Sequence, residues 1–312
     1  MNFDDVLIKP NVHTRFSSRK HVNLNFNPIV ASNMDSIGTF EMARVFTQLK
    51  CIVILHKYYT ANEIISFYNE NKEHYKYIGI SSGMDTKKLY MILEQIPIEI
   101  VCLDIAHGGM KQFIELCKEF KIKYPKIVLI AGNICTYKGY SALSKVNVDI
   151  VKAGIGGGSV CSTRTVTGVG YPQLQMILDI VSKRKFTFGK KALLMSDGNC
   201  KTPGDICKAL VAGADFVMIG GMLSGTDESA GKIINKENKK YKEFYGMASQ
   251  TALKKHHDKS EISYRAAEGI TKLIPCKGPV SLIVSEILGG IRSCCSYIGT
   301  NDLKSGKFIK IK

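Results

Sequence analysis

The sequence contains no apolar stretch close to the ~20 residues that a membrane-spanning helix needs. Its first residues, MNFDDVLIKP, show no basic segment followed by an apolar core, so we expect no secretion signal. The ten cysteines form no CxxC pair, and the adjacent Cys294 and Cys295 have poor geometry for an ordinary disulfide bond. These absences argue against a membrane, exported or disulfide-stabilised protein. They predict a protein of the reducing cytoplasm.

The chain also has no internal repeat and no low-complexity tract, and acidic residues are the minority among its charges. Lys and Arg number 43 against 27 Asp and Glu, which gives a net charge of +16. The lysines are scattered, and no basic arm or aromatic–basic interleaving indicates a nucleic-acid interface. The charge is typical of a soluble lysine-rich protein or of one that binds small anions. A basic nucleic-acid-binding or scaffold protein stays as the non-enzyme alternative.

Eight short apolar runs alternate with amphipathic stretches. The runs are rich in valine and isoleucine and lack regular polar alternation, which is typical of strands buried on both faces. They are NPIVASNMD, CIVILHKYY, YIGISSGM, IEIVCLDIAHG, KIVLIAGNI, VDIVKAGIG, KALLMSDGN and ADFVMIGGM. The stretches between them have helical spacing, and Thr202, Pro203 and Asp205 form a typical helix start. The pattern predicts an α/β protein.

Eight strands that alternate with helices favour a (β/α)8 TIM barrel over an open doubly wound sheet. The predicted strands all end in small or chemically capable residues, whereas an open sheet gathers its ligand groups at one switch point. These ends are Asn33, His56–Lys57, Ser81–Ser82, Asp104, Gly132–Asn133, the glycine-rich segment after Lys152, Asp197 and Gly220–Gly221. We predict a single barrel domain over residues 1–312, with a mobile, irregular flap at about 232–279 that is too polar to form its own core.

The glycine-rich segment Lys152–Gln173 reads KAGIGGGSVCSTRTVTGVGYPQ and carries Cys161. Glycines let a backbone approach a ligand closely, but this spacing matches neither the Walker motif nor GxGxxG. A single cysteine is most often a small buried hydrophobe. Here, however, backbone amides and the Arg164 guanidinium would favour the thiolate, and Thr163 could pass a proton to a group on the same carbon. The segment therefore predicts thiol chemistry at an sp2 carbon.

The last two predicted barrel strands end in SDGN and GGM. Backbone N–H groups at these ends of a barrel commonly hold a phosphate, although Gly220–Gly221 could also be a plain turn. Asp197 would repel a phosphate, so we expect its carboxylate to accept hydrogen bonds from ribose hydroxyls. Glu268, in SYRAAEG of the flap, could be a solvated charge, and His107 could be a satisfied polar group or a base.

Several segments together resemble the GMP reductases. They are GIGGGSVCSTRTVTGVGYPQ, SDGNCKTPGDICKALVAGADFVMIGGM, FYGMAS, YRAAEG and LGGIRSCCSYIG, and the related IMP dehydrogenases share the first two. Weaker similarity in FDDVLIKP, VASNMDSIGTFEMA, LDIAHG and AGNI extends the resemblance over nearly the whole chain. The resemblance implies a homotetrameric barrel enzyme that reduces GMP to IMP and ammonia with NADPH.

The resemblance also assigns roles to individual positions. Cys161 matches the family nucleophile, which adds to C2 of the purine to form a covalent thioimidate, and Thr163 with Glu268 matches the pair that moves the proton for ammonia. The nucleotide-binding residues would be Asp197, Gly198, Asn199, Gly220, Gly221, Gly246, Met247, Ala248, Arg265, Ala266, Ala267, Glu268 and Gly269. The cofactor-binding residues, some from a neighbouring subunit, would be Ser18, Arg19, Lys57, Asp104, Ile105, Ala106, Ile155, Gly156, Met247, Tyr264, Arg265, Ser293, Cys294, Cys295 and Ser296. A monovalent cation, K+ or Na+, would be held at Gly156, Gly158, Cys161 and Arg164.

The sequence departs from the family pattern at a few positions without losing a catalytic group. Gly157 stands where the family usually has proline, Asn199 where it has the last glycine of DGG, and Ala248 where it has serine. The glycine at position 157 should make the loop more flexible. His107 stands where several reductases carry asparagine.

IMP dehydrogenase is the close alternative, because it uses the same cysteine but hydrolyses the thioimidate with water. The dehydrogenases supply a base in the flap as arginine followed by tyrosine, whereas here Tyr264 precedes Arg265, which is the reductase order. They also usually carry a regulatory CBS module after the second barrel strand. Here only KYYTANEIISFYNENKEHYK separates that strand from the third. Both features favour a reductase.

Overall fold

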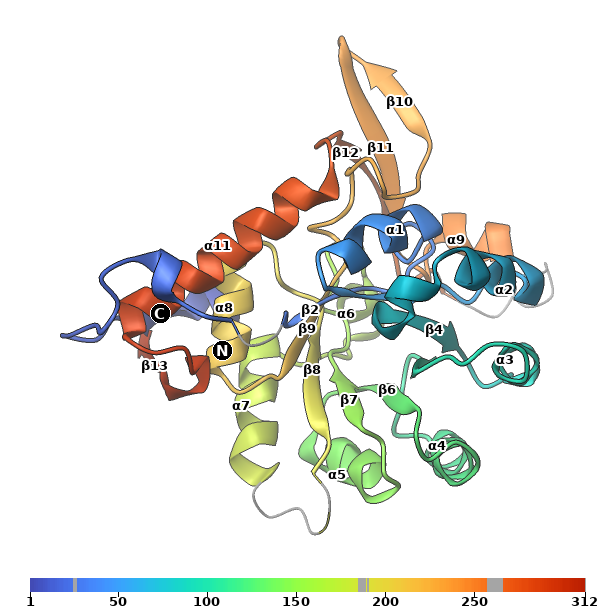
Figure 1. Cartoon of the computed structure of the whole chain (residues 1–312), viewed down its shortest axis with the longest axis horizontal. Helices are drawn as coiled ribbons and strands as arrows, with labels where there is room; N and C mark the ends of the chain where they lie inside the picture. The colour runs from blue at the N-terminus through green and yellow to red at the C-terminus, as the bar shows by residue number, and fades with distance from the viewer. Residues whose placement is uncertain (25–26, 185–188, 190, 257–265, 312) are drawn as a thin grey trace.

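The computed structural model describes residues 1–24, 27–184, 189, 191–256 and 266–311. Eight parallel strands close into a barrel in sequence order, and the first pairs with the last (Figure 1). The strands are β2 (Ile29–Ala31), β3 (Ile52–Leu55), β4 (Ile78–Ser82), β5 (Ile100–Asp104), β6 (Val128–Ile134), β7 (Ile150–Ala153), β8 (Leu193–Asp197) and β9 (Phe216–Ile219). The predicted (β/α)8 barrel is confirmed, and each of the eight apolar runs supplies one strand.

Helices surround this barrel (Figure 1). The longer ones are α1 (Phe40–Gln48), α2 (Ala61–Glu70), α3 (Lys87–Leu93), α4 (Lys111–Lys123), α5 (Tyr137–Lys145), α7 (Gln173–Arg184), α8 (Pro203–Val211) and α11 (Val280–Ile298). The predicted start of α8 is confirmed, because Thr202 Oγ1 accepts from Asp205 N at 3.2 Å and Asp205 Oδ2 accepts from Thr202 N at 3.1 Å. Among the described residues, none of the helices combines the length and the apolar character needed to cross a bilayer.

Two apolar layers explain why the strands lack polar alternation. One cluster of side chains fills the barrel interior, and it comprises Val30, Ile54, Ile100, Cys102, Ile130, Ile150, Met195 and Met218. The neighbouring strand residues belong to a second, larger cluster with the helices. Successive side chains of a strand point to opposite faces, so both faces of each strand must be apolar. Polar side chains are then confined mainly to the strand ends.

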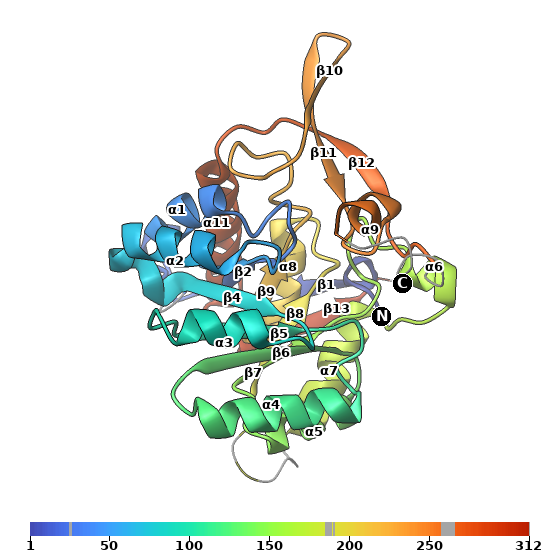
Figure 2. The same cartoon turned by 90° about the vertical axis from the view of Figure 1, so that its right-hand side faces the viewer.

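The segment after β9 is a small sheet rather than the irregular loop that we expected. β10 (Ile233–Lys236), β11 (Lys239–Tyr245) and β12 (Thr271–Pro275) form an antiparallel sheet, and α9 (Gln250–His256) follows β11. The β10–β11 hairpin projects from the barrel in both views (Figures 1 and 2). β11 pairs with β10 on one side and with β12 on the other, and Phe244 of β11 packs into the core that the helices share, so the sheet needs no core of its own. Its mobility stays a prediction.

A buried ammonium group fixes the base of this sheet. Lys242 of β11 is 8% exposed, and its Nζ donates to the carbonyls of Thr226, Asp227 and Ser229 at 2.9, 3.0 and 2.6 Å. A buried ammonium is stable only when acceptors replace its water, and here three carbonyls do so. The sheet is therefore tied to the connection that follows β9.

The two ends of the chain pair with each other outside the barrel. β1 (Val6–Lys9) and β13 (Lys307–Lys310) are antiparallel, with Val6 opposite Lys310. Phe3 and Val6 reach the core that the helices share. The remaining short helices are α6 (Thr163–Thr167), η1 (Phe3–Asp5), η2 (Arg19–His21), η3 (Lys72–Tyr77) and η4 (Leu303–Ser305).

Candidate active site

The glycine-rich segment after β7 presents Cys161 at partial exposure. Cys161 N donates to Gly158 O at 3.0 Å, which closes a tight turn just before the cysteine. Thr163 begins α6, and its Oγ1 lies 3.2 Å from Cys161 Sγ. The two side chains that the sequence pairs as nucleophile and proton-transfer group are therefore in direct contact.

The Glu268 segment lies against the cysteine, although more than 100 residues separate the two in sequence. Ser162 N donates to Glu268 O at 2.9 Å, and Ile270 N donates to Val160 O at 2.9 Å. Cys161 and Gly269 form an isolated antiparallel bridge. The three predicted catalytic residues therefore come together through backbone hydrogen bonds that fix the two segments side by side.

The predicted nucleotide segment at Gly246–Ala248 joins the same structure. Glu268 N donates to Ala248 O at 2.9 Å, and Gly246 N donates to Ile270 O at 3.2 Å. Gly269 approaches so closely that a Cβ there would lie 2.9 Å from Ser249 N, which explains glycine at this position. The predicted binding residues at 246–248 and 266–269 thus line up beside the cysteine. Arg265, which the resemblance adds to the nucleotide and cofactor sets, and Tyr264, which it adds to the cofactor set, lie outside the described residues.

The ends of β8 and β9 also meet the glycine-rich segment. A Cβ on Gly157 would lie 3.3 Å from Asn199 Cβ, and a Cβ on Gly221 would clash with Ser159 Oγ. Asn199 has φ 65°, in the left-handed region that asparagine tolerates better than most residues. Asn199 can therefore replace the family glycine here, and it does so directly against Gly157, the other position at which the loop departs from the family pattern.

A buried lysine that the sequence analysis missed connects two predicted binding carboxylates. Lys152 Nζ lies 3.1 Å from Asp104 Oδ1 and 2.8 Å from Asp197 Oδ2. Burial alone would lower the pKa of Lys152, but the two carboxylates raise it above its ordinary value. Asn133 and Asn33 complete the network, because they donate to Asp197 Oδ2 at 2.8 Å and to Asp104 Oδ2 at 2.7 Å. A lysine inside the apolar run VDIVKAG is the sequence signal that could have identified it.

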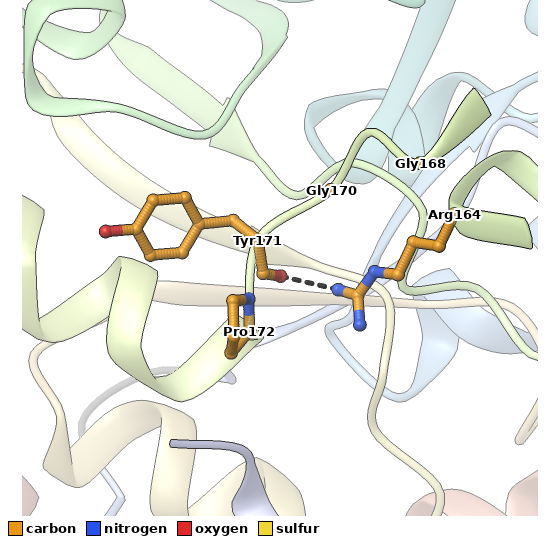
Figure 3. A pocket seen from close by; sticks show the side chains of 5 residues that line it. All are labelled: Arg164, Gly168, Gly170, Tyr171 and Pro172. Carbon is orange, nitrogen blue, oxygen red and sulfur yellow. Dashed lines mark hydrogen bonds between the residues drawn. The ribbon is translucent and has the colours of Figure 1, made fainter.

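Arg164 braces the loop that carries the cysteine (Figure 3). Its Nη2 donates to Tyr171 O, and together with Gly168, Gly170 and Pro172 these residues line a pocket. A Cβ on either Gly156 or Gly170 would lie 2.6 Å from Arg164 Cγ, so the side chain runs between two glycines. We predicted that the Arg164 guanidinium would favour the cysteine thiolate. Its described hydrogen bond instead joins α6 to the segment before α7.

Of the predicted cofactor residues, Ile155 and Gly156 lie in the glycine-rich segment and Met247 follows β11, whereas most of the other described ones fall into two groups. Lys57 and Asp104 both lie near Gly83, which follows β4, because a Cβ on Gly83 would lie 3.6 Å from Lys57 Nζ and 4.0 Å from Asp104 O. The second group comes from η2 and the C-terminal half of α11, where Ser293–Ser296 lie. Figure 1 places that half of α11 on the opposite flank from α2, which follows Lys57. One copy of the chain therefore brings together only part of the predicted cofactor set.

Comparisons with known proteins find a match over nearly the whole chain. A family model described as "IMP dehydrogenase / GMP reductase domain" matches residues 1–311. The chain is similar to the human protein named "GMP reductase 2", at 41% identity over 97% of this chain and 91% of that protein. It is also similar to proteins named "GMP reductase" from Caenorhabditis elegans and Ascaris suum. Each is 42% identical over 97% of this chain, and the alignments cover 88% and 90% of those proteins.

Proposed function

This chain belongs to the IMP dehydrogenase / GMP reductase family, and we propose that it is a GMP reductase that converts GMP to IMP and ammonia with NADPH. The contact between Cys161 and Thr163, beside the Glu268 segment, carries the proposal. The names of the similar proteins support the reductase over the dehydrogenase. So does the order Tyr264–Arg265 in the sequence.

The chemistry begins at the sulfur. The Cys161 thiolate adds to C2 of the purine, so a C–S bond forms and the purine ring takes up the electron pair. The C2–N bond then breaks, and Thr163 with Glu268 delivers the proton that lets nitrogen leave as ammonia. The result is a thioimidate, which is electrophilic at C2. After reduction at C2 the C–S bond breaks, the thiolate returns, and IMP is released.

The described residues fit a reduced nicotinamide cofactor. When bound, this cofactor supplies the hydride that C2 takes up. Lys57 is exposed beside Asp104 at the barrel mouth, so an ammonium group is available to the anionic parts of a dinucleotide. The second group, on η2 and α11, lies on another flank, which supports our proposal that a neighbouring subunit in a homotetramer completes the cofactor site.

A monovalent cation also fits the cysteine loop. Carbonyl oxygens are suitable ligands for such an ion, and the left-handed φ of 74° at Gly156 turns the backbone sharply before Gly158 and Cys161. The ion would hold the turn in shape while the thiol reacts. We propose K+ or Na+ at these carbonyls. Arg164 would support the site by bracing the loop.

A paired assay tests the proposal. Addition of GMP should oxidise NADPH, which is measured as a fall in the absorbance of NADPH, whereas IMP with NAD should give no NADH. GMP with NADH and IMP with NADP then test the cofactor preference. Turnover of IMP with NAD and none of GMP would assign the chain to the dehydrogenases instead. Nucleic-acid binding that persists at physiological salt, without either activity, would favour the basic scaffold alternative.

A further inference from the structure

One buried carboxylate joins the segment after β11 to the barrel. Asp35 lies in the connection between β2 and α1, and its side chain is 2% exposed. Its Oδ2 accepts hydrogen bonds from Tyr245 Oη at 2.7 Å and Lys255 Nζ at 3.0 Å, and His256 Nε2 lies 2.8 Å away. Tyr245 ends β11, and Lys255 and His256 end α9. A single oxygen therefore holds both ends of the stretch between them.

The groups around Asp35 also support one another. Lys255 Nζ donates to Tyr245 Oη at 3.1 Å, and the His256 ring stacks on Tyr58 with centroids 3.5 Å apart. Burial alone would raise the pKa of Asp35, but the hydrogen bonds from His256, Tyr245 and Lys255 bring it below its ordinary value. The carboxylate is therefore charged at neutral pH, and its negative charge holds the three donors together.

The turn that carries Asp35 is rigidly attached to the barrel. Gly38 N donates to Met34 O at 2.7 Å, and His56 N donates to Gly38 O at 3.0 Å. A Cβ on Gly38 would lie 2.2 Å from Ile54 O, so the turn passes directly over β3 and only glycine fits. Asp35 is thus a fixed point to which the later segment is attached.

The stretch held at both ends contains the predicted nucleotide residues Gly246–Ala248. Tyr245 immediately precedes them, and α9 begins three residues after Met247. Asp35 also reaches into the stretch itself, because its N–H points to Met247 Sδ at 3.4 Å. The sequence motifs identify Gly246–Ala248 but give no function to Asp35 or to the end of α9.

We infer that Asp35 is a positioning residue, which sets the place of Gly246–Ala248 by fixing Tyr245 and α9 to the first barrel connection. That these residues bind GMP rests on the proposed function, whereas the attachment itself does not. Asp35 touches no reacting atom in this scheme. It acts on nucleotide affinity through the residues that it holds.

The test substitutes Asp35→Asn, which keeps the shape but removes the charge that orders the donors. In the ligand-free protein, amide exchange in peptides from Tyr245 to His256 should become about tenfold faster. In steady-state kinetics KM for GMP should rise about tenfold, while kcat changes less than about threefold, because uniform binding is lost. Tyr245→Phe removes only the hydroxyl and should shift both readouts in the same direction by a smaller factor. If Asp35→Asn does not fold, Tyr245→Phe provides the test instead.

Adjacent lysines give a matched control. Lys255→Met removes a donor to Asp35 and should raise KM for GMP, whereas Lys254→Met makes the same change at a likewise exposed position that gives Asp35 no described donor, and it should leave KM unchanged. Unchanged exchange in both Asp35→Asn and Tyr245→Phe would refute the attachment. Faster exchange with an unchanged KM would refute the positioning. If the wild-type protein does not turn over GMP, the proposed function fails, and the exchange measurement still decides whether Asp35 holds the segment.

Discussion

Buried His56 should make the stability of this protein depend on pH. His56 follows β3 and is 8% exposed; its Nδ1 accepts from Tyr58 N at 3.2 Å, and its ring stacks on Tyr59 at 4.0 Å. Burial lowers the pKa of His56 from 6.5 to about 4, which the nearby Asp35 carboxylate opposes only in part. The folded protein therefore holds a neutral ring at neutral pH, as the accepted hydrogen bond requires.

The sign of the effect depends on which state binds the proton. Between pH 6.5 and about 4 the unfolded chain protonates His56 and the folded protein does not, so acid favours unfolding in this window. A His56 pKa that falls from 6.5 to about 4 on folding corresponds to a change of about 3 kcal/mol in the free energy of unfolding. The free energy of unfolding should fall by about this amount across the window. The loss from His56 should stop below the folded pKa, where both states hold the proton.

The variant His56→Gln isolates this contribution, because glutamine stays neutral throughout. Urea unfolding at several pH values should show that the variant lacks the wild-type loss of about 3 kcal/mol between neutral pH and about pH 4. His13→Gln makes the same substitution at an exposed position and controls for the change itself. NMR titration of the ring measures the pKa directly. A midpoint near 6.5 for His56 in the folded protein, or parallel pH profiles for wild type and His56→Gln, would refute the reasoning.

Other predictions concern the reaction and the loop that carries it. Cys161→Ala should lower GMP turnover at least ~1,000-fold while calorimetry still detects GMP binding, because the C–S bond cannot form; substantial residual turnover would contradict a covalent route. Thr163→Ala should slow ammonia release more than hydride transfer, and pre-steady-state measurements that show hydride transfer slowed more by the substitution would reverse the assignment. Gly157→Ala should lower the free energy of unfolding by ~1 kcal/mol, because the added methyl group would press against Asn199. Adding Asn199→Gly to this variant should recover most of the loss, so additive effects of the two substitutions would contradict the contact. Lys152→Met should lower the free energy of unfolding by ~3 kcal/mol, because it removes the cation between two partly buried carboxylates, and Lys152→Arg should lower it less. An unchanged free energy of unfolding for Lys152→Met in denaturant unfolding would count against this network.

The barrel could be predicted because its strands carry a strong local signal. Runs such as CIVIL are apolar on both faces, and both faces of β3 are buried. The start of α8 at Thr202 was equally local, since its capping bonds join residues three apart. Contacts of this kind are encoded within a few residues, so the sequence alone is enough to find them.

The parts that the sequence did not predict depend on distant partners. The small sheet depends on β12, which pairs with β11 only after the chain has passed through α9 and the residues that follow it. Lys152 has partners on β5 and β8, and the contact of Arg164 with Tyr171 depends on how the chain returns after α6. The resemblance to a known family pointed to Cys161 and Thr163, whose side chains lie 3.2 Å apart, and their catalytic roles stay a prediction. It could not show that Asp35 holds a segment some 200 residues away, at Tyr245.

The pairing of β1 with β13 has a consequence for synthesis on the ribosome. Residues Val6–Lys9 emerge before all eight barrel strands, whereas their partners at Lys307–Lys310 emerge after them. Domains generally begin to fold while the chain is still growing. The barrel can thus close before this ribbon exists, and β1 stays without its partner strand until β13 has been made.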